Sequence, residues 1–198
     1  MCQHARVRRL WPFITVAVAI TFLSGCGASS TTPATIPRAA DAQHATLDWV
    51  ESTGSPNARL VFRVQRFSVT QGGWNAHVSV TNDTKATFAI DGVSEPFRHA
   101  FGLMLFRTGS HDELERRNAD YTLPVLREAM TFEPALPKSL GPSVTWSGTL
   151  SSRGALPSGA WVRLVFGVFT PEGPMPAGLA PAGNAVVTWI TDHAHRLQ

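Results

Sequence analysis

Apolar and polar residues alternate along much of the chain beyond residue 58, which is the pattern of β-strands that bury one face. The alternation runs through residues 60–64, slips by one position at 65–66 and continues through 67–69. Such a slip predicts a β-bulge. A glycine-containing turn at 71–73 and a second alternating run at 74–80 complete the pattern of an antiparallel hairpin with one face in solvent.

Shorter apolar runs predict further strands at residues 86–90, 101–106, 130–132, 144–150, 161–169 and 186–190. One short surface helix ending at Ala119 is expected among them, because Ser110 and Glu113 have the spacing of a capping box. About seven short strands separated by turns predict an all-β fold, an antiparallel β-sandwich. In general form this body resembles the immunoglobulin-like domains of bacterial surfaces, although it lacks a Cys…Trp…Cys pattern.

Residues 1–25 have the three parts of an export signal. Arg6, Arg8 and Arg9 form a positively charged front, and residues 10–23 are nearly all apolar. As a helix, this apolar stretch would span roughly 21 Å, which is short of the ~30 Å hydrocarbon core of a bilayer. The pattern therefore favours a cleaved signal peptide over a transmembrane helix.

The end of this segment, Leu23-Ser24-Gly25-Cys26, matches the lipobox, and in this respect the chain resembles bacterial prolipoproteins. The resemblance implies a diacylglyceryl group on the Cys26 sulfur and cleavage by lipoprotein signal peptidase between Gly25 and Cys26. It also implies a lipid-anchored location on the extracytoplasmic side of the cell membrane, or on the outer membrane if the organism has one. The predicted organisation is a signal peptide over 1–25, the lipidated cysteine and a flexible linker over 26–46, and the β-sandwich domain over 47–198.

The formal net charge of +3 belongs to the signal peptide. Beyond residue 25, fourteen basic side chains stand against fourteen acidic ones, and no cluster of Lys and Arg remains to follow a phosphate backbone. We therefore do not expect a nucleic acid as partner. The two cysteines are Cys2 and Cys26, so we expect the folded domain to contain no disulfide and no cysteine metal site.

One group of residues near the C-terminus has the composition of a metal site. Asp192 is followed by His193 and His195, and on a strand the two histidines would share a face. Two ligands at this spacing need a third from elsewhere, and the sequence does not identify it. The competing interpretation is a polar chain end, and we expect no metal or cofactor.

Catalytic patterns are not found in the sequence. His111 and Asp112 are adjacent on the predicted helix and would point about 100° apart, which disfavours an acid–base pair. Glu113 and Glu115 fall on different sides of the same helix, which does not suit a glycosidase. The sequence contains no Gly-x-Ser-x-Gly motif and no phosphate-binding glycine loop. We expect no catalytic residue.

Four tryptophans fall on predicted strands, which favours packing in the core: Trp74, Trp146, Trp161 and Trp189. Solvent-facing indoles would instead suit a sugar ring or a protein partner. The loop 171–183, with Met175 and Leu179, is a second place where a partner is expected to dock.

These observations lead to two hypotheses about function. In the first, the chain is a membrane-anchored lipoprotein whose β-sandwich is a non-enzymatic binding or envelope-assembly module, with an envelope protein or a glycan as partner. In the alternative, it is a ligand- or metal-binding lipoprotein that uses the region of His193 and His195.

Overall fold

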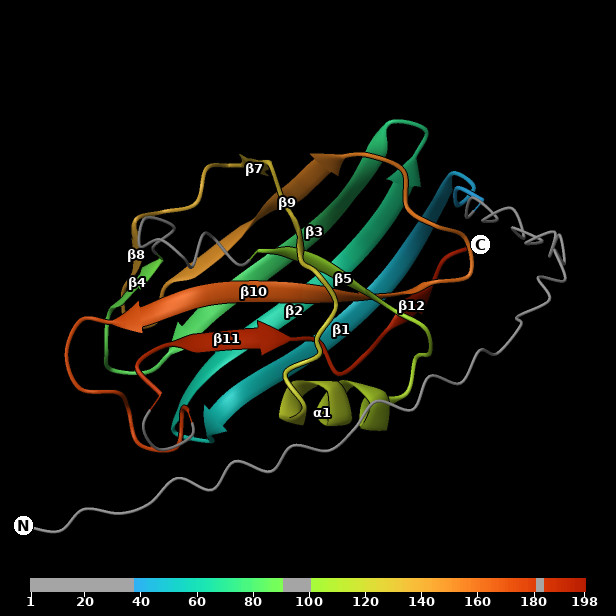
Figure 1. Cartoon of the computed structure of the whole chain (residues 1–198). Coiled ribbons are helices and arrows are strands. Elements are labelled where there is room, and N and C mark those ends of the chain that lie inside the picture. The colour runs from blue at the N-terminus through green and yellow to red at the C-terminus, as the bar shows by residue number, and fades with distance from the viewer. Residues whose placement is uncertain (1–37, 91–100, 181–183) are drawn as a thin grey trace, which may run out of the picture. The chain divides into compact units, whose positions relative to one another are not determined.

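The computed structural model describes residues 38–90, 101–180 and 184–198. Within them the chain forms two antiparallel β-sheets and one α-helix (Figure 1). The all-β antiparallel sandwich predicted from the sequence is confirmed. Cys2, the lipobox and most of the expected linker lie outside the described residues, so the signal peptide and the lipid anchor stay predictions.

The first sheet has five strands and contains the longest strands of the protein. Its strand order is β1 (Gln43–Ser55), β2 (Ala58–Thr70), β3 (Gly73–Asp83), β9 (Thr145–Arg153) and β7 (Thr131–Glu133). The hairpin predicted from residues 60–80 is thus confirmed as β2 and β3, and β1 pairs with β2 on its other side.

The second sheet is built around one long strand, β10 (Trp161–Pro171). Its strand order is β6 (Arg127–Glu128), β5 (Gly102–Phe106), β10, β4 (Phe88–Ile90) and β8 (Ser139–Leu140), and both β11 (Val187–Ile190) and β12 (His195–Arg196) also pair with β10. In Figure 1, β10 and β11 lie in front of the long strands of the first sheet. The described residues form twelve strands, whereas the sequence indicated about seven. Besides β1, the pattern missed β6, β8 and β12, whose two residues each are too few to show a period.

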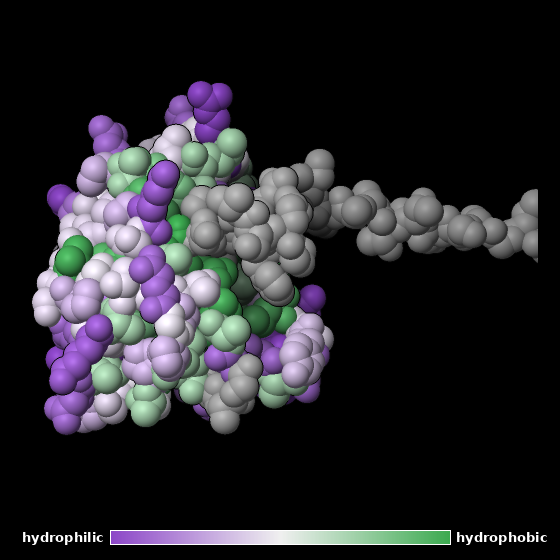
Figure 2. Space-filling model, turned by 90° about the vertical axis from the view of Figure 1, so that its left-hand side faces the viewer, coloured by the Kyte–Doolittle hydropathy of each residue, from purple (hydrophilic) through white to green (hydrophobic). Residues whose placement is uncertain are grey.

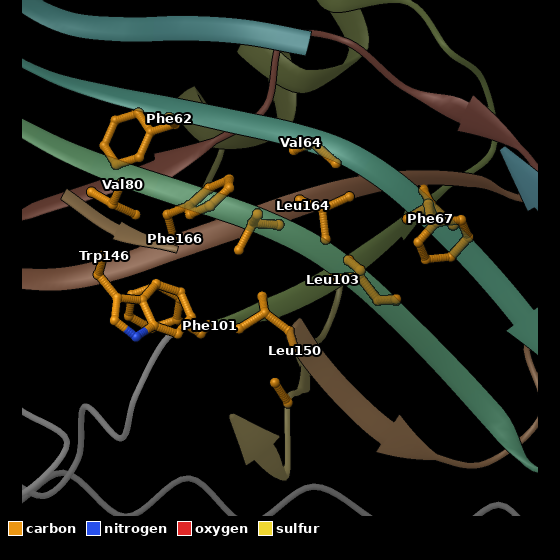
Figure 3. Close-up of a cluster of buried hydrophobic side chains, with 14 of the residues drawn as sticks. Phe62, Val64, Phe67, Val80, Phe101, Leu103, Trp146, Leu150, Leu164 and Phe166 are labelled. Atoms are coloured by element: carbon orange, nitrogen blue, oxygen red, sulfur yellow. The ribbon is translucent and has the colours of Figure 1, made fainter. Parts of the chain in front are cut away.

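Aromatic side chains from both sheets meet in the core (Figure 3). The ring of Phe62 on β2 lies 5.1 Å from that of Phe166 and 5.9 Å from that of Phe169, both on β10. Phe101 also contacts these two phenylalanines edge-on. The inward positions of β2, β3 and β9 supply the rest of this layer, as the alternation of apolar residues predicts.

The β-bulge predicted at 65–66 is confirmed. The register of β2 against β3 shifts between Val64 and Arg66, and the opposing part of β1 shifts between Thr46 and Trp49. Asp48 in the β1 irregularity has a φ of 49°, a left-handed conformation that Asp tolerates better than most residues. Since β1 is an edge strand, its irregularity interrupts the regular edge that another chain could extend.

β1 itself is not predicted by the hydrophobic pattern. It begins at Gln43, within the segment expected to be linker, and its inward positions carry few large apolar residues. Glu51 occupies one of these buried positions. A strand that buries a carboxylate breaks the alternation on which the sequence prediction depends.

Helix α1 (His111–Ala119) is confirmed, but its predicted capping box is wrong. The Ser110 side chain makes no capping hydrogen bond. Glu113 instead accepts hydrogen bonds from the backbone N–H and the hydroxyl of Thr108, at 3.0 and 2.5 Å, and from Arg117 at 2.9 Å. The Thr108 hydroxyl is the largest influence that lowers the pKa of Glu113, and burial opposes it.

The surface is of mixed character in the view of Figure 2, where strongly hydrophilic side chains project between smaller hydrophobic areas. Across residues 38–90, 101–180 and 184–198, no helix has the length and apolar composition needed to cross a bilayer.

Candidate functional site

His193 and His195, the residues considered as metal ligands in the alternative hypothesis, point to different parts of β1. His193 Nδ1 lies 2.7 Å from Glu51 Oε1, and the imidazole stacks on Trp49. His195 Nε2 lies 3.1 Å from the Gln43 side-chain oxygen, eight positions away from Glu51 along the strand. Over the described part of the chain, no three His, Cys, Asp or Glu side chains are grouped in a way that could hold a metal ion.

His111 does not pair with its neighbour Asp112. Its ring lies between two other carboxylates, with Nε2 3.3 Å from Glu115 and Nδ1 3.6 Å from Asp192. All three side chains are about half exposed or more. Burial, followed by the nearby Glu51 carboxylate, raises the pKa of Asp192. The contact with Asp192 links α1 to the C-terminal segment at a solvent-exposed place, where such a contact adds little stability.

Glu51 is the centre of a buried network that the sequence did not reveal. Its Oε2 accepts hydrogen bonds from the Trp189 indole N–H at 2.7 Å and from the backbone N–H of Asp192 at 2.9 Å. Its Oε1 accepts the backbone N–H of His193 at 3.0 Å as well as the imidazole. We call these four residues the Glu51 network. It holds the chain after β11 against the first sheet.

Arg163 on β10 has a similar structural role. The side chain is fully buried and lies over the Phe106 ring, 5.4 Å from its centroid. It donates hydrogen bonds to four backbone carbonyls, those of Gly109, Ser110, Thr191 and Asp192. Burial lowers the pKa of this guanidinium, and the carboxylates of Asp192 and Glu51 oppose that effect. The Arg163 guanidinium thus holds the loop before α1 and the segment after β11 in place, and it is too deeply buried to meet a ligand.

The five tryptophans of the described residues form no exposed aromatic patch. Trp74 and Trp146 are buried, while Trp49, Trp161 and Trp189 are partly buried. In the described part of the predicted docking loop, residues 171–180, Leu179 is buried in the core and Met175 packs against it. The two docking surfaces considered from the sequence thus serve mainly the packing of the domain over the described residues.

The outer face of the first sheet carries a different kind of feature, a polar groove of about 400 Å³. Two neighbouring rows of side chains cross the strands β1, β2, β3 and β9 there. By strand register, the first row is Thr46, Arg66, His77 and Thr149, and the second is His44, Ser68 and Asn75. We call these seven residues the outer-face groove.

Hydrogen bonds within the outer-face groove leave its centre available. His44 Nδ1 lies 2.9 Å from the Ser68 hydroxyl, and His77 Nδ1 lies 3.4 Å from the Thr149 hydroxyl. Among the described residues, no hydrogen bond or ion pair is made by the guanidinium of Arg66, which is exposed. The groove therefore places hydroxyl and amide groups around the Arg66 guanidinium, which has no protein partner among the described residues.

Sequence reasoning missed this groove although its signal was present. The residues between the apolar positions of β2, β3 and β9 are rich in Ser, Thr and Asn, as expected for any wet face. Only the pairing of the strands shows which of them stand side by side. No family model, curated protein or solved structure shows significant similarity to this chain.

Proposed function

We propose that this chain is a lipid-anchored, non-enzymatic binding module of the bacterial cell envelope, and that it binds its ligand on the outer face of the five-stranded sheet. The lipobox around Cys26 supports the anchor and the location. The single observation that supports binding is the outer-face groove, a polar hollow of about 400 Å³ built from four strands of one rigid sheet.

A sheet face is a suitable place for recognition because its strands hold side chains at fixed spacings. Neighbouring strands lie about 4.8 Å apart, and alternate residues on one strand about 6.6 Å apart. Rows at these spacings present donors and acceptors in a set pattern without ordering a loop on binding. The inward side chains of the same strands, such as Phe67 and Val78, are buried and fix the backbone beneath the groove.

The anchor is tested by expressing the full chain in a bacterium and determining the mass of its N-terminus. We expect removal of residues 1–25, a diacylglyceryl group on Cys26 and recovery in the detergent phase on partitioning. Cys26→Ser should abolish both the modification and the partitioning. An unmodified Cys26 in the exported wild-type protein would refute the lipoprotein assignment.

Binding is tested by sedimenting the detergent-purified full chain with isolated cell envelopes from the same bacterium. We expect wild-type protein to sediment with them and Arg66→Ser/His77→Ser to stay in the supernatant. Arg107→Ser is the matched control, since Arg107 is equally exposed but lies outside the groove. Absence of wild-type sedimentation, or equal sedimentation of the groove variant, contradicts the proposal.

A further inference from the structure

We infer that the ligand of the outer-face groove is an anionic glycan, meaning a sugar or polyol polymer with repeated phosphate or carboxylate groups. The inference rests on the proposed function and adds the chemistry of the ligand. It follows from the placement of two arginines, from the distribution of acids around them and from the neutral side chains between them.

The bulge in β2 places the two arginines on the same face. Arg63 and Arg66 are three positions apart, and in a regular strand they would point to opposite faces. Gln65 is skipped in the pairing, so Arg63 stands opposite Ser79 and Arg66 opposite His77, both on the outer face of β3. The two arginines thus stand opposite alternate residues of β3, which are about 6.6 Å apart along that strand.

Within residues 38–90, 101–180 and 184–198, no acidic side chain forms an ion pair with Arg63 or Arg66. Asp83 is occupied by Arg59, at 3.5 Å, at the end of β2 away from the groove. Asp48 in the β1 irregularity makes no ion pair within the described residues, and the lining of the groove contains no carboxylate. Although the domain is formally neutral beyond residue 25, this part of its surface is positive.

The second hollow on the same face continues the binding surface toward Arg63. It has a volume of about 210 Å³ and is lined in part by Val50, Ser52, Arg63 and Thr81. Its lining also contains two acids, Glu51 and Asp83, whose carboxylates are bound by the Glu51 network and by Arg59. A ligand that engages both arginines must extend across both hollows. A polymer with a charge on successive units meets this requirement, and a single small anion does not.

The uncharged side chains favour a glycan over other polyanions. Thr46, Ser68, Asn75 and Thr149 offer hydroxyl and amide groups that suit sugar or polyol hydroxyls. No Phe, Tyr or Trp side chain lines the groove, and stacking on such rings is how proteins hold single-stranded nucleic acids. No large apolar side chain is present there to enter a membrane surface, as an interfacial protein requires.

The test measures binding of the detergent-purified full chain to immobilised polymers by interferometry. The probes are poly(glycerol phosphate), a polyuronate and neutral dextran, with vesicles of phosphatidylglycerol as a separate arm. We expect binding to at least one of the two anionic polymers, weakening as salt rises, and none to dextran. The stronger of the two identifies the anionic group as phosphate or carboxylate.

Two single variants report on the arginines. Arg63→Gln and Arg66→Gln should each weaken binding about tenfold or more, because each removes a charge-assisted hydrogen bond. Arg107→Gln should leave binding unchanged. Thermal unfolding of all three should match the wild type, since these side chains are exposed.

The outcomes separate this inference from the proposed function. Sedimentation with envelopes but no binding to either anionic polymer overturns the inference and leaves the proposed function intact. Equal binding to dextran, binding to the vesicles alone, or no effect of both arginine variants overturns it as well. Failure to sediment with envelopes refutes the proposed function itself.

Discussion

Replacement of Glu51 by Gln tests whether the Glu51 network holds the C-terminal segment in place. The side chain is 5% exposed, and each carboxylate oxygen accepts two hydrogen bonds from Trp189, Asp192 and His193. A carboxylate can accept from all four donors because it is an acceptor only. Glutamine has the same shape but replaces one of the two oxygens with an NH₂ donor.

The expected cost follows from the geometry. The glutamine oxygen will stay with the more buried donors, the Trp189 indole and the Asp192 N–H, and its NH₂ group will then face His193. The imidazole can adapt by changing tautomer, but the His193 backbone N–H then has a donor opposite it. The variant loses that hydrogen bond, and it also loses the negative charge that strengthens the other hydrogen bonds to this side chain. Together these losses should lower the free energy of unfolding by about 2–4 kcal/mol. For a domain of this size, Tm should fall by roughly 5–15 °C.

The assay is thermal and urea unfolding of the detergent-purified full chain, followed by tryptophan fluorescence because Trp189 reports on the site directly. Glu172→Gln is the control, since Glu172 is exposed and its side chain makes no hydrogen bond within the described residues. It should change the stability by less than about 0.5 kcal/mol. A Glu51→Gln variant that matches this control would refute the claim that the four hydrogen bonds stabilise the domain.

Three further predictions concern buried or strained positions. Arg163→Met removes the donors to four carbonyls and should cost about 2–4 kcal/mol, with faster amide hydrogen exchange in the C-terminal segment; unchanged exchange would contradict it. Gly54→Ala should lower the free energy of unfolding in urea by at least about 2 kcal/mol, because Gly54 has a φ of +109° and a Cβ would lie 2.3 Å from the Ala58 carbonyl oxygen. Gly72→Ala is the control, since a Cβ there meets nothing within 4 Å. Burial lowers the pKa of His195 below its ordinary 6.5, so the folded state disfavours protonation and the stability conferred by the neutral ring is lost as pH falls below 6.5. Urea titrations from pH 7.5 to 5 should show this loss, and a slope unaltered in His195→Gln would exclude His195 as its source.

The candidate site was only partly accessible from the sequence. The alternation along residues 60–80 correctly identified the outward positions of β2 and β3, and the bulge at 65–66 was predicted from the slip in phase. The rest of the groove came from β1 and β9, one strand that the pattern did not indicate and another some 80 residues further along the chain from Arg66. A groove formed by register between such strands has no local signature.

The sequence by itself determined the sandwich, its hairpin and the helix α1, because these depend on local periods of hydrophobicity and on turn residues. The tertiary structure decided where the polar residues meet. In the sequence, Glu51 cannot be told from an ordinary exposed acid, because the donors that bind it come from β11 and the C-terminal segment. The spacing of His193 and His195 suits a pair of metal ligands, but in the fold their rings contact different residues of β1, Glu51 and Gln43. Long-range contacts of this kind depend on strand order and register, which a period of two residues does not encode.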